Sequence, residues 1–268
     1  MGRRCGHSSV VLPGQNRLVL WGGWQDGLPL VHDSEEKRSV TTKLSVLNLS
    51  SIQWNSVPTT GAPPAGVIDY SVTTIGEEVY LFDGGRCDLA GSCVHNDLYQ
   101  LNTSNVWRCI PCTNRPMKKH SCGFISYSYQ GSDYLLALGG VGGEQAPAEP
   151  QLQSLYTRDN WGYYYTNEVH IMNMTAALGI VLYVCVCHYN TTTTTGQWIS
   201  PTTITGDRPI TLSYFSLHLL PHSGNSAIMF GGWTVPEEGK GAQCSNDTYK
   251  LTMTNNTVVS SVLDYYCM

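Results

Sequence analysis

Charged side chains are scarce in this sequence. Asp, Glu, Lys and Arg make up 13% of the 268 residues, against roughly 25% in an average globular protein. The formal net charge is -5 at pH 7, so the chain has no basic field that would attract the phosphates of a nucleic acid. We therefore do not expect nucleic acid among its partners.

Long apolar runs are also missing. The first run, 10–12, is too short for the core of a signal peptide. The longest run, 176–189, is shorter than the roughly 18 residues that a membrane span needs. We expect a cytoplasmic protein with no membrane partner. Six N-x-S/T sequons leave an extracellular protein as the alternative. They begin at Asn48, Asn102, Asn173, Asn190, Asn246 and Asn255.

Motifs for catalysis or phosphate binding are absent from the sequence. It contains no G-x-S-x-G elbow, no H-E-x-x-H motif and no Walker loop. Cys109 and Cys112 have the spacing of half a zinc site, but the sequence has no second pair of ligands at a suitable spacing. The glycine-rich run 139–143 opens no helix, which a phosphate site requires. We expect no enzymatic activity, no metal and no cofactor.

An apolar run that ends in two glycines occurs four times. Each run follows another short apolar segment and a turn, a pattern typical of a β-hairpin. Paired glycines let the backbone leave a strand through positive φ angles that a side chain disfavours. The doublets are Gly22 and Gly23, Gly84 and Gly85, Gly139 and Gly140, and Gly231 and Gly232.

Two more strands are expected after each doublet. The third contains Tyr99 in the second unit and Tyr249 in the fourth, and a tryptophan marks the fourth strand in three units, at Trp54, Trp107 and Trp198. Four strands per unit make one blade of a β-propeller. Large aromatic side chains suit the space between adjacent blades, so we expect these tryptophans to be buried in the core.

On these residues the sequence resembles the kelch repeat, whose period is about 50 residues. The resemblance covers essentially the whole chain and implies an all-β fold, a kelch-type β-propeller with four recognisable blades. We expect one domain, 1–268, with blades near 1–57, 58–112, 113–203 and 204–268. Kelch propellers usually have about six blades. Either this propeller is small or open, or the chain is a fragment whose exposed flanks self-associate or bind a partner.

The third unit is interrupted by an insertion at 176–195. This segment is apolar at first, contains no Asp, Glu, Lys or Arg, and ends in a run of threonines. The run from Val184 to Cys187 is also what a GT-rich nucleotide repeat would encode. Our hypothesis is a retained intron or an expanded microsatellite, and a genuine insertion is the alternative. An uncharged, β-prone stretch of this kind favours aggregation.

The candidate binding residues lie in the long loops. Strands alternate in direction within a blade, so the loops between second and third strands share one face with the connections between blades. Long loops on a rigid scaffold often carry function, and Trp, Tyr and Arg dominate binding hot spots. The sequence predicts a non-catalytic scaffold that binds a protein or peptide there; packing of these side chains back onto the propeller is the alternative. The candidates are Trp24, Arg86, Arg158, Trp161, Tyr164 and Trp233.

A narrower resemblance suggests one specific role. The Trp161-Gly162 loop, the segment 167–171, and Trp198 followed by 206–209 are similar to kelch-domain-only substrate receptors of cullin-RING ubiquitin ligases. That resemblance implies a basic pocket for a C-terminal carboxylate, but Leu212 stands where an arginine would be expected, and no ligase-recruiting segment is recognisable before Met268. From the enzyme class, the alternative is a propeller-based metal-dependent oxidase, whose Tyr and His ligands cannot be placed.

Overall fold

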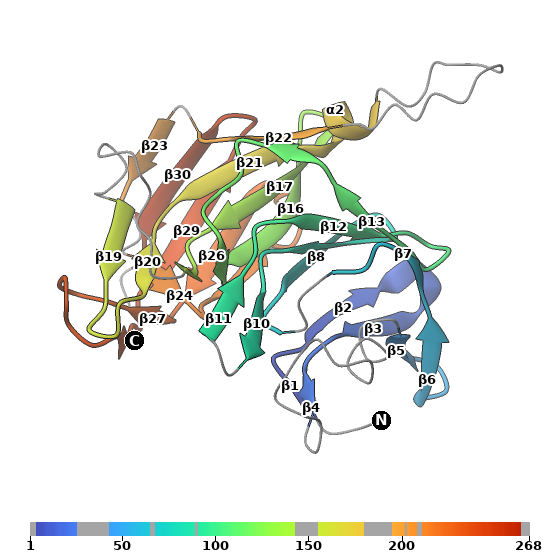
Figure 1. Cartoon of the computed structure of the whole chain (residues 1–268). Helices are drawn as coiled ribbons and strands as arrows, with labels where there is room; N and C mark the ends of the chain where they lie inside the picture. The colour runs from blue at the N-terminus through green and yellow to red at the C-terminus, as the bar shows by residue number, and fades with distance from the viewer. Residues whose placement is uncertain are drawn as a thin grey trace, which may run out of the picture. The chain divides into compact units, whose positions relative to one another are not determined.

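The computed structural model describes residues 4–25, 43–64, 68–88, 91–142, 155–179, 195–201, 203–207 and 211–263 (Figure 1). The chain divides into two compact units. The first comprises Met1–Cys109 with Lys118–Ser121, and the second Ile110–Met117 with Cys122–Met268. The large sheets, which we call blades 1 to 4 in chain order, are described unit by unit. The single-domain organisation stays a prediction.

The first unit contains blades 1 and 2. Blade 1 has the strand order β2-β3-β5-β6, and blade 2 has the order β7-β13-β12-β9-β8. Two short two-stranded sheets accompany them: β1, before β2, pairs with β4, after β3, and β10 and β11 form a hairpin after β9. The bounds are β1 (Arg4–Cys5), β2 (Ser8–Leu12), η1 (Pro13–Gln15), β3 (Arg17–Trp21), β4 (Trp24–Gln25), β5 (Lys43–Asn48), β6 (Gln53–Pro58), β7 (Thr60–Gly61), β8 (Ser71–Ile75), β9 (Glu78–Phe82), β10 (Gly85–Asp88), β11 (Gly91–Val94), β12 (Leu98–Leu101), β13 (Val106–Ile110) and β15 (Lys119–His120).

The second unit contains blades 3 and 4. Blade 3 has the order β14-β22-β21-β17-β16, and blade 4 has the order β23-β30-β29-β26-β25. The bounds are β14 (Cys112–Thr113), β16 (Gly123–Tyr129), β17 (Ser132–Leu138), β18 (Val141–Gly142), β19 (Tyr156–Arg158), β20 (Tyr164–Thr166), β21 (Val169–Asn173), α2 (Met174–Gly179), β22 (Gly196–Ile199), β23 (Thr203–Gly206), β24 (Leu212–Ser213), β25 (Ser216–Leu219), β26 (Ser226–Phe230), β27 (Trp233–Thr234), β28 (Gln243–Cys244), β29 (Thr248–Met253) and β30 (Thr257–Val262).

The core of each unit lies between its two blades. In the first unit the rings of Trp21 and Trp107 pack with centroids 4.8 Å apart, and Tyr99 meets Tyr70 edge to face at 6.4 Å. These four side chains belong to one buried apolar cluster. In the second unit the corresponding cluster includes Tyr249. Alternating strand residues therefore bury one face of each blade against the other.

The three tryptophans expected in the core do not behave alike. Trp107 and Trp198 are buried, with 2% and 0% of their surface exposed, whereas Trp54 is 40% exposed. Trp54 lies on β6, and within the described residues no further strand pairs with β6 on its outer side. Its position in the repeat is that of a core residue, but among the described residues no blade covers this face of blade 1.

Positive φ angles follow the second strand of every blade. They occur at Gly22 and Gly23, at Gly139 and Gly140, and at Gly231 and Gly232. In blade 2, however, the two positive φ angles are those of Asp83 (57°) and Gly84 (99°), and Gly85 is the first residue of β10. In blade 2 the pair of residues with positive φ therefore lies one residue before the glycine pair, Gly84 and Gly85, that the sequence indicates. Asp tolerates the left-handed region better than most residues.

The connections between blades form outer strands. After β6, β13 and β22 the chain runs along the outer edge of the next blade, where β7, β14 and β23 pair in parallel with β13, β22 and β30. Each outer strand ends at a residue with positive φ: Gly61 (86°), Asn114 (51°) just after β14, and Gly206 (87°). A Cβ on Gly61 would overlap the Trp107 carbonyl oxygen, and one on Gly206 would overlap that of Ser260. Only glycine fits at these two positions.

The insertion in the third unit leaves the blade intact. Met172 pairs with Trp198, so β21 and β22 are adjacent strands although α2 and the segment 180–194 separate them in sequence. Residues 180–194 lie outside the described part of the chain. The ends of the two strands are close enough for a short connection.

We predict that Gly61→Ala and Gly206→Ala destabilise the protein far more than Gly76→Ala. Gly76 has a φ of 58°, and no other atom lies within 4 Å of an added Cβ. Its substitution therefore costs only the strain of placing alanine in the left-handed region, roughly 1–2 kcal/mol of stability. The other two variants add a backbone collision, and we expect at least about 2 kcal/mol more. Urea denaturation followed by circular dichroism measures the difference. Equal losses in all three variants would contradict the close approach.

We also predict that deleting 176–195 preserves the fold. The deletion leaves Met174 and Thr175 as a two-residue connection between β21 and β22, with Gly196 as the first residue of β22, and two residues is a common length for a hairpin loop. We expect a melting temperature within about 4 °C of the complete chain, because a change of 1 kcal/mol corresponds to roughly 2–4 °C at this size. A much larger drop would show that the segment stabilises blade 3.

Candidate binding face of blades 3 and 4

The candidate site consists of loops that rise from the second unit. The loop after β17 carries the strands β18, β20 and β19, and the loop after β26 carries the paired strands β27 and β28, of which β27 also pairs with β24. Val141, Tyr165 and Val235 form a small apolar cluster beneath these strands, with Tyr163 and Ala242 packed against it. The loops therefore have a core of their own, which fixes the side chains above it.

Asp159 organises the tip of the first loop. Its carboxylate Oδ1 accepts hydrogen bonds from the backbone N–H groups of Trp161 and Tyr163, both at 2.9 Å. The Asp159 N–H donates to the Tyr163 carbonyl at 2.9 Å, and the side chain is buried. Two N–H donors stabilise a buried carboxylate. Trp161 is thus held at the tip of the loop, with 78% of its surface exposed.

The two loops are joined by hydrogen bonds at their outer ends. The Arg158 N–H donates to Glu238 Oε2 at 2.8 Å, and the Gly239 N–H donates to the Arg158 carbonyl at 2.7 Å. The Asn160 N–H donates to the Lys240 carbonyl at 3.0 Å. The loops of blades 3 and 4 therefore form one continuous surface within the second unit.

The exposed aromatic and basic side chains on this surface come from both blades. Trp161 and Trp233 are exposed, and so is Tyr214 just after β24. The Arg158 guanidinium lies over the Tyr164 ring, 5.9 Å from its centroid, which is a cation–π distance. Burial raises the pKa of the Tyr165 hydroxyl below them, and the charge of Asp159 acts in the same direction. Tyr165 therefore stays neutral at physiological pH.

Four of the six sequence candidates belong to this surface. Arg158, Trp161, Tyr164 and Trp233 lie on its strands and loops, although the structure does not bring all four into mutual contact. The sequence reasoning missed Asp159, Tyr214 and the 237–240 turn; the run Asp159 to Gly162 has the composition of a turn and could have indicated the first of these. Trp24 is the first residue of β4 and Arg86 the second residue of β10, both in the first unit. The side chains of these two residues lie outside the described part of the structure.

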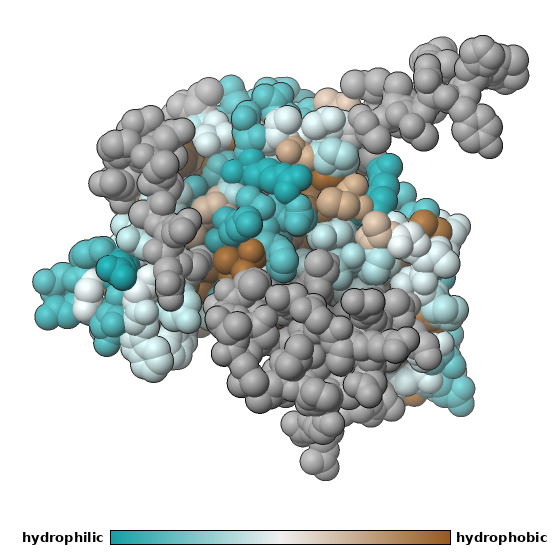
Figure 2. Space-filling view, viewed as in Figure 1, coloured by the Kyte–Doolittle hydropathy of each residue, from teal (hydrophilic) through white to brown (hydrophobic). Residues whose placement is uncertain are grey.

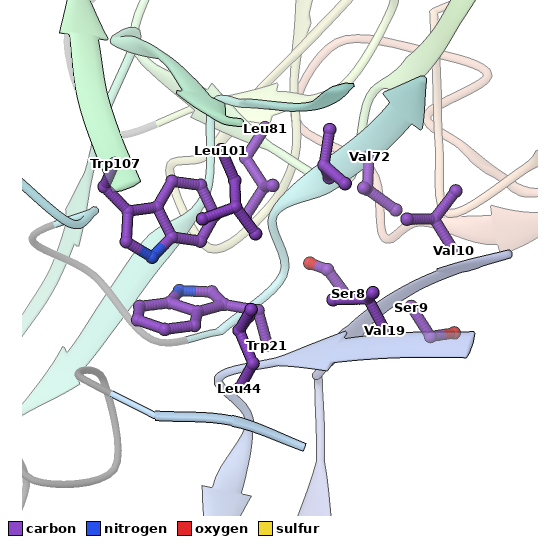
Figure 3. Close-up of a pocket in the computed structure, with 11 residues that line it drawn as sticks. Ser8, Ser9, Val10, Val19, Trp21, Leu44, Val72, Leu81, Leu101 and Trp107 are labelled. Atoms are coloured by element: carbon purple, nitrogen blue, oxygen red, sulfur yellow. The ribbon is translucent and has the colours of Figure 1, made fainter. Parts of the chain in front are cut away.

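Each unit has a small pocket between its two blades. Figure 3 shows a pocket between blades 1 and 2, where the rings of Trp21 and Trp107 lie over one another beside Leu44, Leu81 and Leu101. Its volume is about 10 Å³, as is that of a second void between blades 3 and 4. That is about the space for one water molecule. Both are packing voids between apolar strand residues of neighbouring blades.

The composition of the surface gives no evidence of a metal or of a membrane span. Among the described residues no three His, Cys, Asp or Glu side chains converge on one point. No helix in that part of the chain is long and apolar enough to cross a membrane. In the view of Figure 2 the described residues are mostly hydrophilic or intermediate in hydropathy, with smaller hydrophobic areas between them.

Comparison with known proteins places the chain in a family. The model of the KLHDC2/KLHL20/DRC7 Kelch-repeats domain matches residues 1–177. The chain belongs to the kelch-repeat family. Kelch-repeat relatives are in general non-catalytic interaction proteins, so family membership indicates a protein-interaction domain.

Curated kelch proteins are similar over parts of their length. The chain is 29% identical to Tip elongation aberrant protein 1 of Schizosaccharomyces pombe over 52% of this chain and 11% of that protein. It is 30% identical to the Rab9 effector protein with kelch motifs of Danio rerio, over 34% of this chain and 22% of that protein. Its identity to Kelch domain-containing protein 3 of Bos taurus is 27%, over 41% of this chain and 25% of that protein. The matches thus span a quarter or less of each relative.

A solved structure supports the propeller fold. The structure of YjhT matches with a TM-score of 0.55 at 14% sequence identity, covering 98% of this chain and 65% of that one. At this identity the match concerns the fold alone. Together with the four sheets of described strands, it confirms the all-β, kelch-type propeller expected from the repeats.

We predict that Asp159→Ala loosens the loop without unfolding the blade. The variant loses the acceptor of two backbone N–H groups, so amide hydrogen exchange at Trp161 and Tyr163 should become at least about tenfold faster, the effect of losing roughly 1.4 kcal/mol of local stability. Asp159→Asn retains an acceptor oxygen and serves as the control. Unchanged exchange in Asp159→Ala would show that the loop is held by other contacts.

Proposed function

We propose that this kelch domain binds a protein or peptide through the loop face of blades 3 and 4, with Trp161 as the central contact. The observation that carries the proposal is the fixed exposure of Trp161. A large aromatic side chain that is solvated yet held by a hydrogen-bonded turn loses little conformational entropy when a partner covers it. Tryptophan is also enriched among binding hot spots.

The neighbouring groups support the same role. Arg158 and Lys240 provide cationic side chains, and Glu237 and Glu238 provide anionic ones, so polar groups of both signs surround the aromatic residues. An apolar centre with a polar rim is typical of protein interfaces. In this proposal the chain is a scaffold, without catalysis.

The ligase substrate receptor is a narrower form of the same proposal. It requires basic side chains that bind a C-terminal carboxylate. Leu212, at the position where the resemblance calls for an arginine, is buried in the core cluster of the second unit. Copurification with a cullin adaptor would support this role. The metal-dependent oxidase gains no support from the described residues, and elemental analysis of the purified protein tests it.

The proposed binding face is tested with a phage-displayed library of random peptides selected on the immobilised chain. We expect Trp161→Ala to weaken the selected peptides more than about tenfold, because truncation of a hot spot costs 2 kcal/mol or more. Phe230→Ala is the matched control, since Phe230 is an exposed aromatic residue on a blade strand. Peptides that bind Trp161→Ala and Trp233→Ala as tightly as the wild type would place the site elsewhere.

A further inference from the structure

Blade 1 has an apolar row on the face turned away from blade 2. Val11 pairs with Leu18, Leu18 with Leu47, and Leu47 with Trp54, so the four side chains lie side by side across all four strands. The adjacent row on the opposite face, which contains Val19, belongs to the core between blades 1 and 2. Val11 is 46% exposed, and Trp54 is exposed as described above. We call this row the blade 1 open face.

Within the described part of the chain, the edge of blade 1 has no paired strand either. Blades 2, 3 and 4 each have an outer parallel strand, β7, β14 or β23, against their fourth strand. In blade 1 the described residues supply no such strand, and β6 is exposed along nearly its whole length. A free edge next to an exposed apolar face is a place where another chain can pair.

Blade 4 has a complementary exposed position. The last residue of the second strand is buried in the first three blades, at Trp21, Phe82 and Leu138, but Phe230 in blade 4 is 45% exposed. Phe230 points away from blade 3, because Ala227 and Met229 on the same strand form the core between blades 3 and 4. We call the face that carries Phe230, Ile228 and Val259 the blade 4 open face.

The contact inside the first unit shows how two such positions fit. Trp21 ends the second strand of blade 1, and Trp107 lies on the fourth strand of blade 2; their rings pack directly. Phe230 occupies the repeat position of Trp21, and Trp54 occupies that of Trp107. The two open faces therefore present the two halves of a contact that this chain already makes.

We propose that the chain associates head to tail with a second copy of itself, in which the blade 4 open face of one copy packs on the blade 1 open face of the other. Phe230 of the first copy packs against Trp54 of the second. His218 and Lys250 flank Ile228 across the strands of blade 4, so the blade 4 open face is the more polar of the two. The association is accordingly reversible. A head-to-tail contact leaves one open face free at each end, so a dimer can extend or close into a ring.

Sedimentation of the complete chain tests this association. Between roughly 1 and 100 μM, where specific interfaces of moderate strength assemble, the average mass of the wild type should rise from 29.4 kDa towards at least twice that value. Trp54→Arg and Phe230→Arg should each weaken the association more than about tenfold. Trp161→Arg changes an exposed tryptophan on the loop face and should leave the mass unchanged.

Mixing the two variants separates loss of the contact from misfolding. Trp54→Arg retains the blade 4 open face and Phe230→Arg retains the blade 1 open face, so an equimolar mixture should form dimers that cannot extend. A wild-type chain that stays at 29.4 kDa overturns the proposal. So does a mixture that stays monomeric while both variants keep the wild-type circular dichroism spectrum. Peptide binding by the loop face is independent of either result.

Discussion

A β-sheet with an apolar face must cover that face, and within each unit of this chain the cover is the other blade. The contact between Trp21 and Trp107 illustrates the arrangement: a large ring at the end of one blade's second strand meets a ring on the next blade's fourth strand. The positive φ angles, the outer strands and the loop face all depend on this stacking, because each must leave the broad faces of the sheets free to meet.

Much of the fold was accessible from the sequence because the repeat positions are set by local backbone geometry. Paired glycines mark the reversal after a strand, and Trp107 and Trp198 are buried as their place in the repeat indicates. Asp83 shows the limit of this reasoning: the left-handed conformation is fixed by the strand end, and an aspartate can adopt it when glycine is absent. The exposure of Trp54 depends on whether a neighbouring blade exists, which no local pattern records.

The candidate site was only partly predictable for a different reason. Long loops rich in Trp, Tyr and Arg indicated the candidate surface, but the hydrogen bonds that shape it connect residues far apart in the sequence. Asp159 acts on its own loop, whereas Glu238 reaches the backbone of Arg158 from the next blade. Tyr214, which is exposed on this surface, has a positive φ of 55°. Tyrosine rarely adopts this conformation, so the sequence does not predict it.

The outer parallel strands give the connections between blades a second role. A segment such as 59–62 joins two blades and also closes the edge of the second one, with Gly61 against the Trp107 carbonyl. Two requirements therefore fix the length of this connection: it must reach from one blade to the next, and it must pair with β13 on the way. The loops after the second strands have no such double constraint. Over evolutionary time, insertions and deletions should accumulate in those loops while the connections keep their length, so that recognition diversifies around an almost unchanging scaffold.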